Sequence, residues 1–156
     1  MLFRSTNIDS CFKAAQILLD LAEKQAESER SENDAQELKE LQDAYQGTGR
    51  GLISGGAKAV KDLEKEQKSS KTRVIRDNID GALLDITTFY RDVLVFQSQS
   101  EEILNLDLED IISSYARTTS AKRTIQQIEA VLEARTNLSR NAAPLATLEA
   151  LFCALK

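Results

Sequence analysis

Residues 75–94 read IRDNIDGALLDITTFYRDVL, and the spacing of their apolar side chains indicates the fold class. These side chains recur at steps of three and four residues, which places them on one face of a helix. The members of this stripe are Ile75, Ile79, Leu83, Ile86, Phe89, Tyr90, Val93 and Leu94. Because no proline and no pair of glycines interrupts the stretch, it predicts one long helix, or two nearly collinear ones, that begins in the charged residues before it.

Apolar residues at helical spacing also follow Ile8 and predict an N-terminal helix, with Asn7 or Asp9 as its cap. The polar run 27–37 is either a solvent-exposed extension of this helix or a break before a short helix, and the pattern leaves both open. The helical pattern ends at a glycine-rich stretch, residues 47–56. Glycine has a permissive backbone, so this stretch predicts a connecting loop.

Three shorter helices are expected after the long one. One starts near Asp107, whose carboxylate can accept the free amides of a first turn, and the last is introduced by Asn141 and Pro144. Between them a helix carries the apolar residues from Ile125 to Leu138. No stretch alternates apolar and polar residues as a half-buried strand does. The sequence therefore predicts an all-α fold, a single bundle of five or six helices over residues 1–156.

Composition argues against several classes of function. The chain has no histidine, so it lacks the commonest metal ligand and general base and cannot form a Ser-His-Asp triad. Its formal net charge of -5 argues against binding that neutralises many phosphates. We therefore predict no catalytic residue, no metal site and no cofactor. Near Met1 there is no apolar run of the signal-peptide or membrane-spanning kind, which favours a cytoplasmic location.

The two cysteines, Cys11 and Cys153, are too few for a disulfide framework of the secreted kind. Each has a phenylalanine as neighbour in the sequence. Because a free cysteine commonly packs as a small apolar side chain, we expect both to be buried.

Three features could carry chemistry, and each has a plainer interpretation. Residues 51–58 contain glycines and a lysine but lack the Ser or Thr that follows the lysine of a phosphate-binding loop, so a connecting loop is expected. Asp85 and Asp92 share one predicted helix face, where two acids could act together, yet solvated or paired charges are the commoner case. The basic segment 58–76 is interleaved with acids and predicts a solvated face; a weak contact with DNA or a partner stays open.

Two segments of the chain carry a resemblance to a known family. They are residues 61–95, KDLEKEQKSSKTRVIRDNIDGALLDITTFYRDVLV, and residues 141–151, NAAPLATLEAL. Together they resemble the C-terminal helical domain of DNA polymerase III delta prime subunits of actinobacterial type. The resemblance covers residues 38–156 and extends more loosely towards Ile8.

The resemblance implies a role in DNA replication. In this family the domain joins a circular collar of five helical domains, one from each clamp-loader subunit, with gamma or tau and delta as partners. The loader opens the sliding clamp and places it on primed DNA, so contact with DNA would be indirect and no membrane is involved. The ATPase-like domains of the family, with their nucleotide-handling residues, do not occur in this chain. The resemblance thus implies a non-catalytic oligomerisation domain, and we expect that Met1 is not the natural start of the protein.

A collar domain needs apolar patches that stay exposed after folding and match its neighbours. The candidates lie on the long central helix and on the last helix: Phe89, Tyr90, Val93, Leu145, Leu148, Leu151 and Phe152. Each could equally belong to the core of the domain.

Two other functions remain open from the sequence. A free-standing helical adaptor or coiled-coil regulator that self-associates is suggested by the acid-rich stretch 20–43. An enzyme with paired carboxylates in a bundle core is the other, and added divalent metal would raise its melting temperature.

Overall fold

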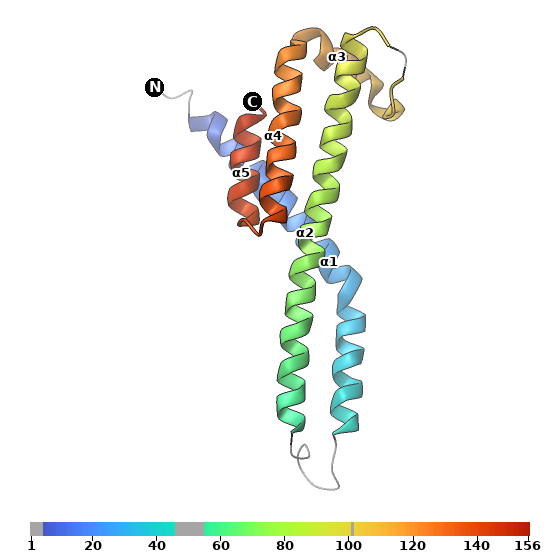
Figure 1. The fold of residues 1–156 in the computed structure, drawn as a ribbon, viewed down its shortest axis with the longest axis vertical. Helices are drawn as coiled ribbons and strands as arrows, with labels where there is room; N and C mark the ends of the chain where they lie inside the picture. The colour runs from blue at the N-terminus through green and yellow to red at the C-terminus, as the bar shows by residue number, and fades with distance from the viewer. Residues whose placement is uncertain (1–4, 46–54, 101) are drawn as a thin grey trace. The chain divides into compact units, whose positions relative to one another are not determined.

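The structure is a computed structural model that describes residues 5–45, 55–100 and 102–156 (Figure 1). Within these ranges every regular element is helical, which confirms the predicted all-α fold with five α-helices. The elements are α1 (Ser5–Ala44), α2 (Gly56–Gln97), the short 3-10 turn η1 (Leu106–Leu108), α3 (Glu109–Thr118), α4 (Ala121–Ser139) and α5 (Pro144–Ala154). Residues 47–54 of the predicted glycine-rich loop lie outside the described residues.

The first two helices are longer than their apolar patterns. α1 is continuous, so the polar run 27–37 is an exposed extension and not a break. Because α1 already includes Ser5, Asn7 and Asp9 lie inside it, and the prediction that one of them caps the helix is wrong. Apolar periodicity marks only the part of a helix that packs against a core, and backbone hydrogen bonds carry the helix beyond that part.

The helix ends beside the glycine-rich stretch are set by the backbone. The amide of Tyr45 donates to the carbonyl oxygens of Leu41 and Gln42, each at 3.2 Å, and α1 ends just before it at Ala44. At the other side Gly55 has a φ of 96°, a left-handed conformation that glycine adopts without steric cost. α2 then begins at Gly56 and is a single helix.

Two predicted helix starts were wrong in detail. Asp107 lies in η1 and does not cap α3, which follows Leu108 and carries Glu109 and Asp110 in its first turn. Asn141 has a φ of 65°, and its amide donates to Leu138 O at 3.0 Å, so it closes the end of α4. Asparagine is one of the few residues that tolerate this conformation after a helix. Pro144 is the first residue of α5, as predicted.

The chain divides into two compact units. The bundle unit consists of Met1–Leu19 and Ile79–Lys156, and the hairpin unit consists of Asp20–Asn78. Both α1 and α2 run through the two units.

All five helices contribute buried apolar side chains to the bundle unit. They are Cys11 and Ala15 of α1, Ile79, Leu83, Tyr90 and Val93 of α2, Ile112 and Ala116 of α3, Val131, Ala134 and Leu138 of α4, and Leu148 and Leu151 of α5. Fully burying one Leu, Ile or Val side chain contributes about 1.5 to 3 kcal/mol. These contacts hold the unit together, and α4 and α5 lie side by side within it (Figure 1).

Polar side chains in the bundle unit form hydrogen bonds with backbone groups at helix ends. The side chain of Gln97, the last residue of α2, donates to Thr119 O at 2.7 Å and to Ala116 O at 3.3 Å. These are carbonyl groups that the end of α3 leaves without helical partners. The hydroxyl of Thr124 on α4 donates to Gln97 Oε1 at 3.4 Å, so one glutamine links three helices.

The hairpin unit packs the second half of α1 antiparallel to the first half of α2. Asn78 Nδ2 donates to Ala22 O at 3.3 Å, and Gln67 Nε2 donates to Asp34 O at 2.9 Å farther along. Among the described residues of this unit, Ala22 and Ala26 are the buried hydrophobic side chains. The hairpin therefore has little apolar core, and polar contacts make up much of its seam.

In the part of the chain that the structure describes, no helix has the length and hydropathy needed to cross a membrane.

Candidate functional site

An apolar groove opens on the surface of the bundle unit, with a volume of about 430 Å³. Its walls are Ser10, Cys11 and Ala14 of α1, Ile86, Phe89 and Tyr90 of α2, and Phe152, Leu155 and Lys156 at the C-terminal end. A cavity of roughly 150 Å³ lined by apolar side chains already binds benzene. The groove is therefore large enough to hold one or two large apolar side chains of another protein.

The aromatic part of the groove is fixed by ring packing. Phe89 and Tyr90 have ring centroids 5.4 Å apart at an interplanar angle of 72°, an edge-to-face arrangement. Tyr115 of α3 lies 6.0 Å from each of them. Such aromatic pairs contribute about 0.5 to 1.5 kcal/mol beyond their burial, so this wall is preformed.

A polar cluster supports the groove from α4. Burial, together with the neighbouring Tyr115, raises the pKa of Tyr90 to about 12. Its hydroxyl is therefore neutral at physiological pH. The buried side chain of Gln127 donates through Nε2 to Tyr115 Oη and to Leu155 O, each at 2.7 Å. This glutamine thus holds the C-terminal rim of the groove to α3 and α4.

The C-terminal residues are held from two sides. Arg123 of α4 donates to Ala154 O at 2.9 Å. From α1, Cys11 Sγ donates to Phe152 O at 3.3 Å, and Lys156 Nζ donates to Ser10 Oγ at 2.5 Å. The groove between α1 and the end of α5 is therefore bounded by specific hydrogen bonds.

The seven predicted interface residues fall into three groups. The structure brings three of them together in the groove: Phe89, Tyr90 and Phe152. Three others lie buried in the bundle unit: Val93, Leu148 and Leu151. Leu145, in the first turn of α5, is half-buried and does not line the groove.

The predicted interface set did not include the six other residues that line the groove, which are Ser10, Cys11, Ala14, Ile86, Leu155 and Lys156. Ile86 could have been included from the sequence, because it precedes Phe89 and Tyr90 on the same helical face.

A second apolar surface lies on α4. The side chains of Ile125 and Leu132 are 47% and 44% exposed, and Ile128 between them is half-buried. Their spacing of three and four residues places all three on one stripe, as in the seam of a two-helix coiled coil. None of them lines the groove. The stripe is thus a separate candidate contact surface.

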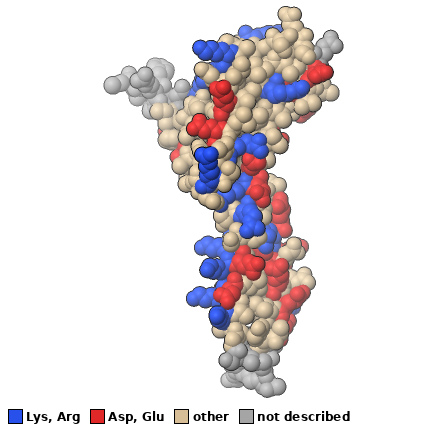
Figure 2. All heavy atoms as spheres, viewed as in Figure 1, with Lys and Arg blue, Asp and Glu red and all other residues tan. Residues whose placement is uncertain are grey.

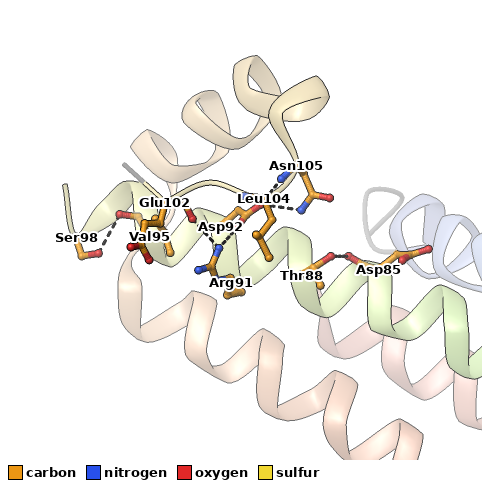
Figure 3. A network of polar contacts seen from close by, with 9 residues as sticks. All are labelled: Asp85, Thr88, Arg91, Asp92, Val95, Ser98, Glu102, Leu104 and Asn105. Carbon is orange, nitrogen blue, oxygen red and sulfur yellow. Dashed lines mark hydrogen bonds and ion pairs between the residues drawn. The ribbon is translucent and has the colours of Figure 1, made fainter. Parts of the chain in front are cut away.

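Asp92, within the YRDV motif of the sequence, anchors the chain segment that follows α2 (Figure 3). Its fully buried carboxylate accepts hydrogen bonds from Arg91 Nη1 at 2.7 Å and from the amides of Leu104 and Asn105 at 3.1 and 2.8 Å. Asn105 Nδ2 adds a fourth at 2.7 Å, and Arg91 also donates to Glu102 O at 2.7 Å. The network is structural and fixes residues 102–105 against α2.

The ionisation of Asp92 follows from this network. Burial by itself would raise the pKa of this carboxyl, but the hydrogen bonds from Asn105, Arg91 and Leu104 outweigh it and lower the pKa below its ordinary value. A carboxylate that accepts several N–H bonds is stabilised in its charged form. Asp92 is therefore a satisfied anion at neutral pH.

The structure does not assemble a carboxylate pair from Asp85 and Asp92. Asp85 is exposed, and Figure 3 shows it apart from the Asp92 network. Both oxygens of Asp92 are occupied by N–H donors. Among the residues described, no group of three or more Cys, Asp or Glu side chains could hold a metal ion.

In the hairpin unit, charges of opposite sign meet across the seam. Acids outnumber bases on the α1 half and bases outnumber acids on the α2 half, and Figure 2 shows both kinds side by side over this unit. Lys71 forms an ion pair with Glu27, and Gln67 Nε2 donates to Glu37 Oε2 at 3.2 Å. The rest of the basic segment 58–76 includes an exposed face, which carries Lys58, Lys61, Lys65 and Lys68.

Part of the chain matches a known protein family. Residues 74–148 match the family model described as DNA polymerase III, delta subunit, C terminal. No curated protein and no solved structure matches the chain. The matched region runs from within α2 to α5, so it includes the Asp92 network, the α2 wall of the groove and the α4 stripe. This part of the chain is therefore similar to the C-terminal domain of a clamp-loader subunit.

Proposed function

We propose that this chain is a non-catalytic oligomerisation domain of a DNA polymerase III clamp loader. In this role it joins the C-terminal domains of the gamma or tau and delta subunits in a five-domain collar in the cytoplasm, and it reaches DNA only through the assembled loader. The observation that carries the proposal is the match of residues 74–148 to the C-terminal family model. Two apolar surfaces support it: the α4 stripe lies within the matched residues, and the groove has its α2 wall there.

A domain inside a closed ring contacts two neighbours through two different surfaces. The groove and the α4 stripe have no residue in common, so they are suited to this requirement. Aromatic anchors in well-packed pockets dominate the energy of many interfaces. We therefore assign Phe89, Tyr90 and Phe152 to one contact and Ile125, Ile128 and Leu132 to the other.

The assignment to delta prime, and not to delta, is the finer part of the proposal. It rests on the resemblance of residues 61–95 and 141–151 to delta prime subunits, whereas the matched model describes the delta subunit. The two subunits occupy different places in one ring. A delta prime domain would therefore coexist with delta in the assembly, and a delta domain would compete with it.

Native mass spectrometry of the chain with the C-terminal domains of gamma or tau and of delta from the same organism tests both parts. We expect a hetero-oligomer with one copy of this chain, in which added delta domain is incorporated alongside it. Displacement of this chain by delta would support delta and contradict delta prime. A persistent homodimer would favour the self-associating adaptor.

Variants at the two surfaces locate the contacts. Phe152→Glu in the groove and Leu132→Glu on the stripe should each weaken assembly at least tenfold, about 1.4 kcal/mol or more, because each places a charge in a desolvated contact. Ile17→Glu is the matched control, since Ile17 is an exposed apolar residue of the bundle unit outside both surfaces. Equal effects of all three variants would contradict the assigned surfaces.

A further inference from the structure

The two cysteines of the chain, 142 positions apart in sequence, meet at the rim of the groove. Cys11 is buried on α1 and Cys153 is exposed on α5, and neither is in a disulfide. Cys11 Sγ donates to the carbonyl oxygen of Phe152, the residue before Cys153, at 3.3 Å. The side chains of Cys153 and Cys11 are also within hydrogen-bonding reach of each other.

The exposure of Cys153 differs from the prediction that both cysteines are buried. Cys153 was expected to be buried, but it lies two positions after the buried Leu151 on α5 and so faces another direction. The hydrogen bond from Lys156 Nζ to Ser10 Oγ holds the same turn of α1 against the same end of α5. This hydrogen bond and the one from Cys11 to Phe152 thus hold α1 to the chain segment that carries Cys153.

We propose that Cys11 and Cys153 form a reversible disulfide that joins α1 to the end of α5 along one wall of the groove. The exposed Cys153 is the thiol that an external oxidant can reach, and the buried Cys11 is the resolving thiol. A disulfide needs Cβ atoms close together and correctly directed. Because Cys11 Sγ already contacts the carbonyl oxygen of Phe152, the residue before Cys153, α1 and the end of α5 approach closely at this point.

The oxidant belongs to the class of small-molecule disulfides, for which oxidised glutathione is the probe. The Cys153 thiolate attacks one sulfur of the probe, which forms a mixed disulfide and releases the first small thiol. The Cys11 thiolate then attacks the Cys153 sulfur, which forms the intramolecular disulfide and releases the second small thiol. Two protein thiols are oxidised, one small disulfide is reduced, and the two protons end on the two released thiols.

The surroundings of Cys153 affect the rate at which its thiolate attacks the small-molecule disulfide. Partial removal from water, the hydrogen bond with Cys11 and the negative charge of Glu149 raise the pKa of the Cys153 thiol, and Lys156 partly opposes them. Because the thiolate is the attacking species, oxidation should be slow at neutral pH and faster at alkaline pH. In a reducing compartment such a bond is transient.

Oxidation of the full chain with oxidised glutathione at alkaline pH tests the proposal. We expect intact mass spectrometry to show the loss of two hydrogen atoms, thiol titration to fall from two to none, and peptide mapping to link Cys11 with Cys153. The closed loop spans most of the chain, so the melting temperature should rise on the order of 10 °C and return after reduction.

Single variants separate the two steps. Cys11→Ser should stop at a stable mixed disulfide on Cys153, and Cys153→Ser should react much more slowly because the remaining thiol is buried. In the wild-type chain, a persistent mixed disulfide, a disulfide-linked dimer or two unreacted thiols would each overturn the proposal. None of these outcomes bears on the collar, so the inference stands or fails apart from the proposed function.

Discussion

Arg135 of α4 holds Asp80 of α2 by two parallel hydrogen bonds, from Nε to Oδ1 at 2.7 Å and from Nη2 to Oδ2 at 2.9 Å. Near the start of α4 and at the end of α2, the hydroxyl of Thr124 donates to Gln97 Oε1. α2 and α4 are thus joined by polar contacts at both ends of their antiparallel overlap. The bidentate geometry is the one that guanidinium and carboxylate groups match best.

Removal of this ion pair should have a small and pH-dependent effect. The Asp80 side chain is 45% exposed, so solvent screens the pair, and we expect Asp80→Asn to lower the free energy of unfolding by about 0.5 to 1 kcal/mol. The hydrogen bond from Arg135 lowers the pKa of Asp80. The contribution is therefore complete above the unfolded pKa, roughly 3.9, and is lost as the pH falls through the folded pKa. Urea unfolding at pH 7 and at pH 3 should show the difference between wild type and variant shrink in acid.

The Asp92 network should matter more. Asp92→Ala removes four hydrogen bonds to a buried charge, and we expect a loss of about 2 to 3 kcal/mol in the free energy of unfolding, measured by urea at pH 7. Because the folded pKa of Asp92 is also lowered, this contribution too is present at neutral pH and lost in acid.

Asp85→Ala is the control for this variant, because Asp85 lies on the same helix but is exposed. Its effect should stay within about 0.5 kcal/mol. If both variants lost the same unfolding free energy, the hydrogen bonds of the Asp92 network would contribute nothing to stability.

The positions of the helices could be predicted from the sequence, whereas several of their ends could not. The stripe that begins at Ile75 has a period that only a helix satisfies, and α2 follows it. Asp107 and Asn141 are residues that often cap helices, but a 3-10 turn occupies the first position and a left-handed residue the second. Such ends depend on backbone hydrogen bonds that a local pattern does not encode.

The candidate site was predictable only in part, because surface and core positions of a helix share the same spacing. Phe89 and Val93 are one turn apart on α2, yet one lines the groove and the other is buried. Val93 packs with Ile112 and Ala116 of α3, whereas Phe89 lines the groove between α1 and the C-terminal end. The meeting of Cys11 with Cys153, and of Asp92 with Asn105, depends on the same long-range packing.

Hydrogen exchange should divide the chain along its two units. The hairpin unit buries Ala22 and Ala26 among its described residues, whereas the bundle unit buries side chains from all five helices. Regions with few buried apolar contacts open with lower free energy. We expect amides of residues 27–40 and 58–70 to exchange faster than amides at the centre of α4, measured by mass spectrometry. Equal protection would mean that the polar seam stabilises the hairpin as well as an apolar core does.

The ion pair between Lys71 and Glu27 in this seam should contribute little to stability. Lys71 is 39% exposed and its partner Glu27 is 59% exposed, so Lys71→Ala should change the melting temperature very little. A cooperative loss of hairpin protection in this variant would show that the pair does more than surface pairs usually do.

Leu148 and Phe152 are one turn apart on α5, and their truncations should separate folding from assembly. Leu148 is fully buried, so Leu148→Ala should cost about 2 to 5 kcal/mol of unfolding free energy through lost burial and the cavity left behind. Phe152 lines the open groove, so Phe152→Ala should cost less stability but weaken binding to a neighbouring collar domain. Thermal unfolding and native mass spectrometry of both variants test this split. If Phe152→Ala destabilised the chain as much as Leu148→Ala and left assembly unchanged, Phe152 would be a core residue and the groove would not be a contact surface.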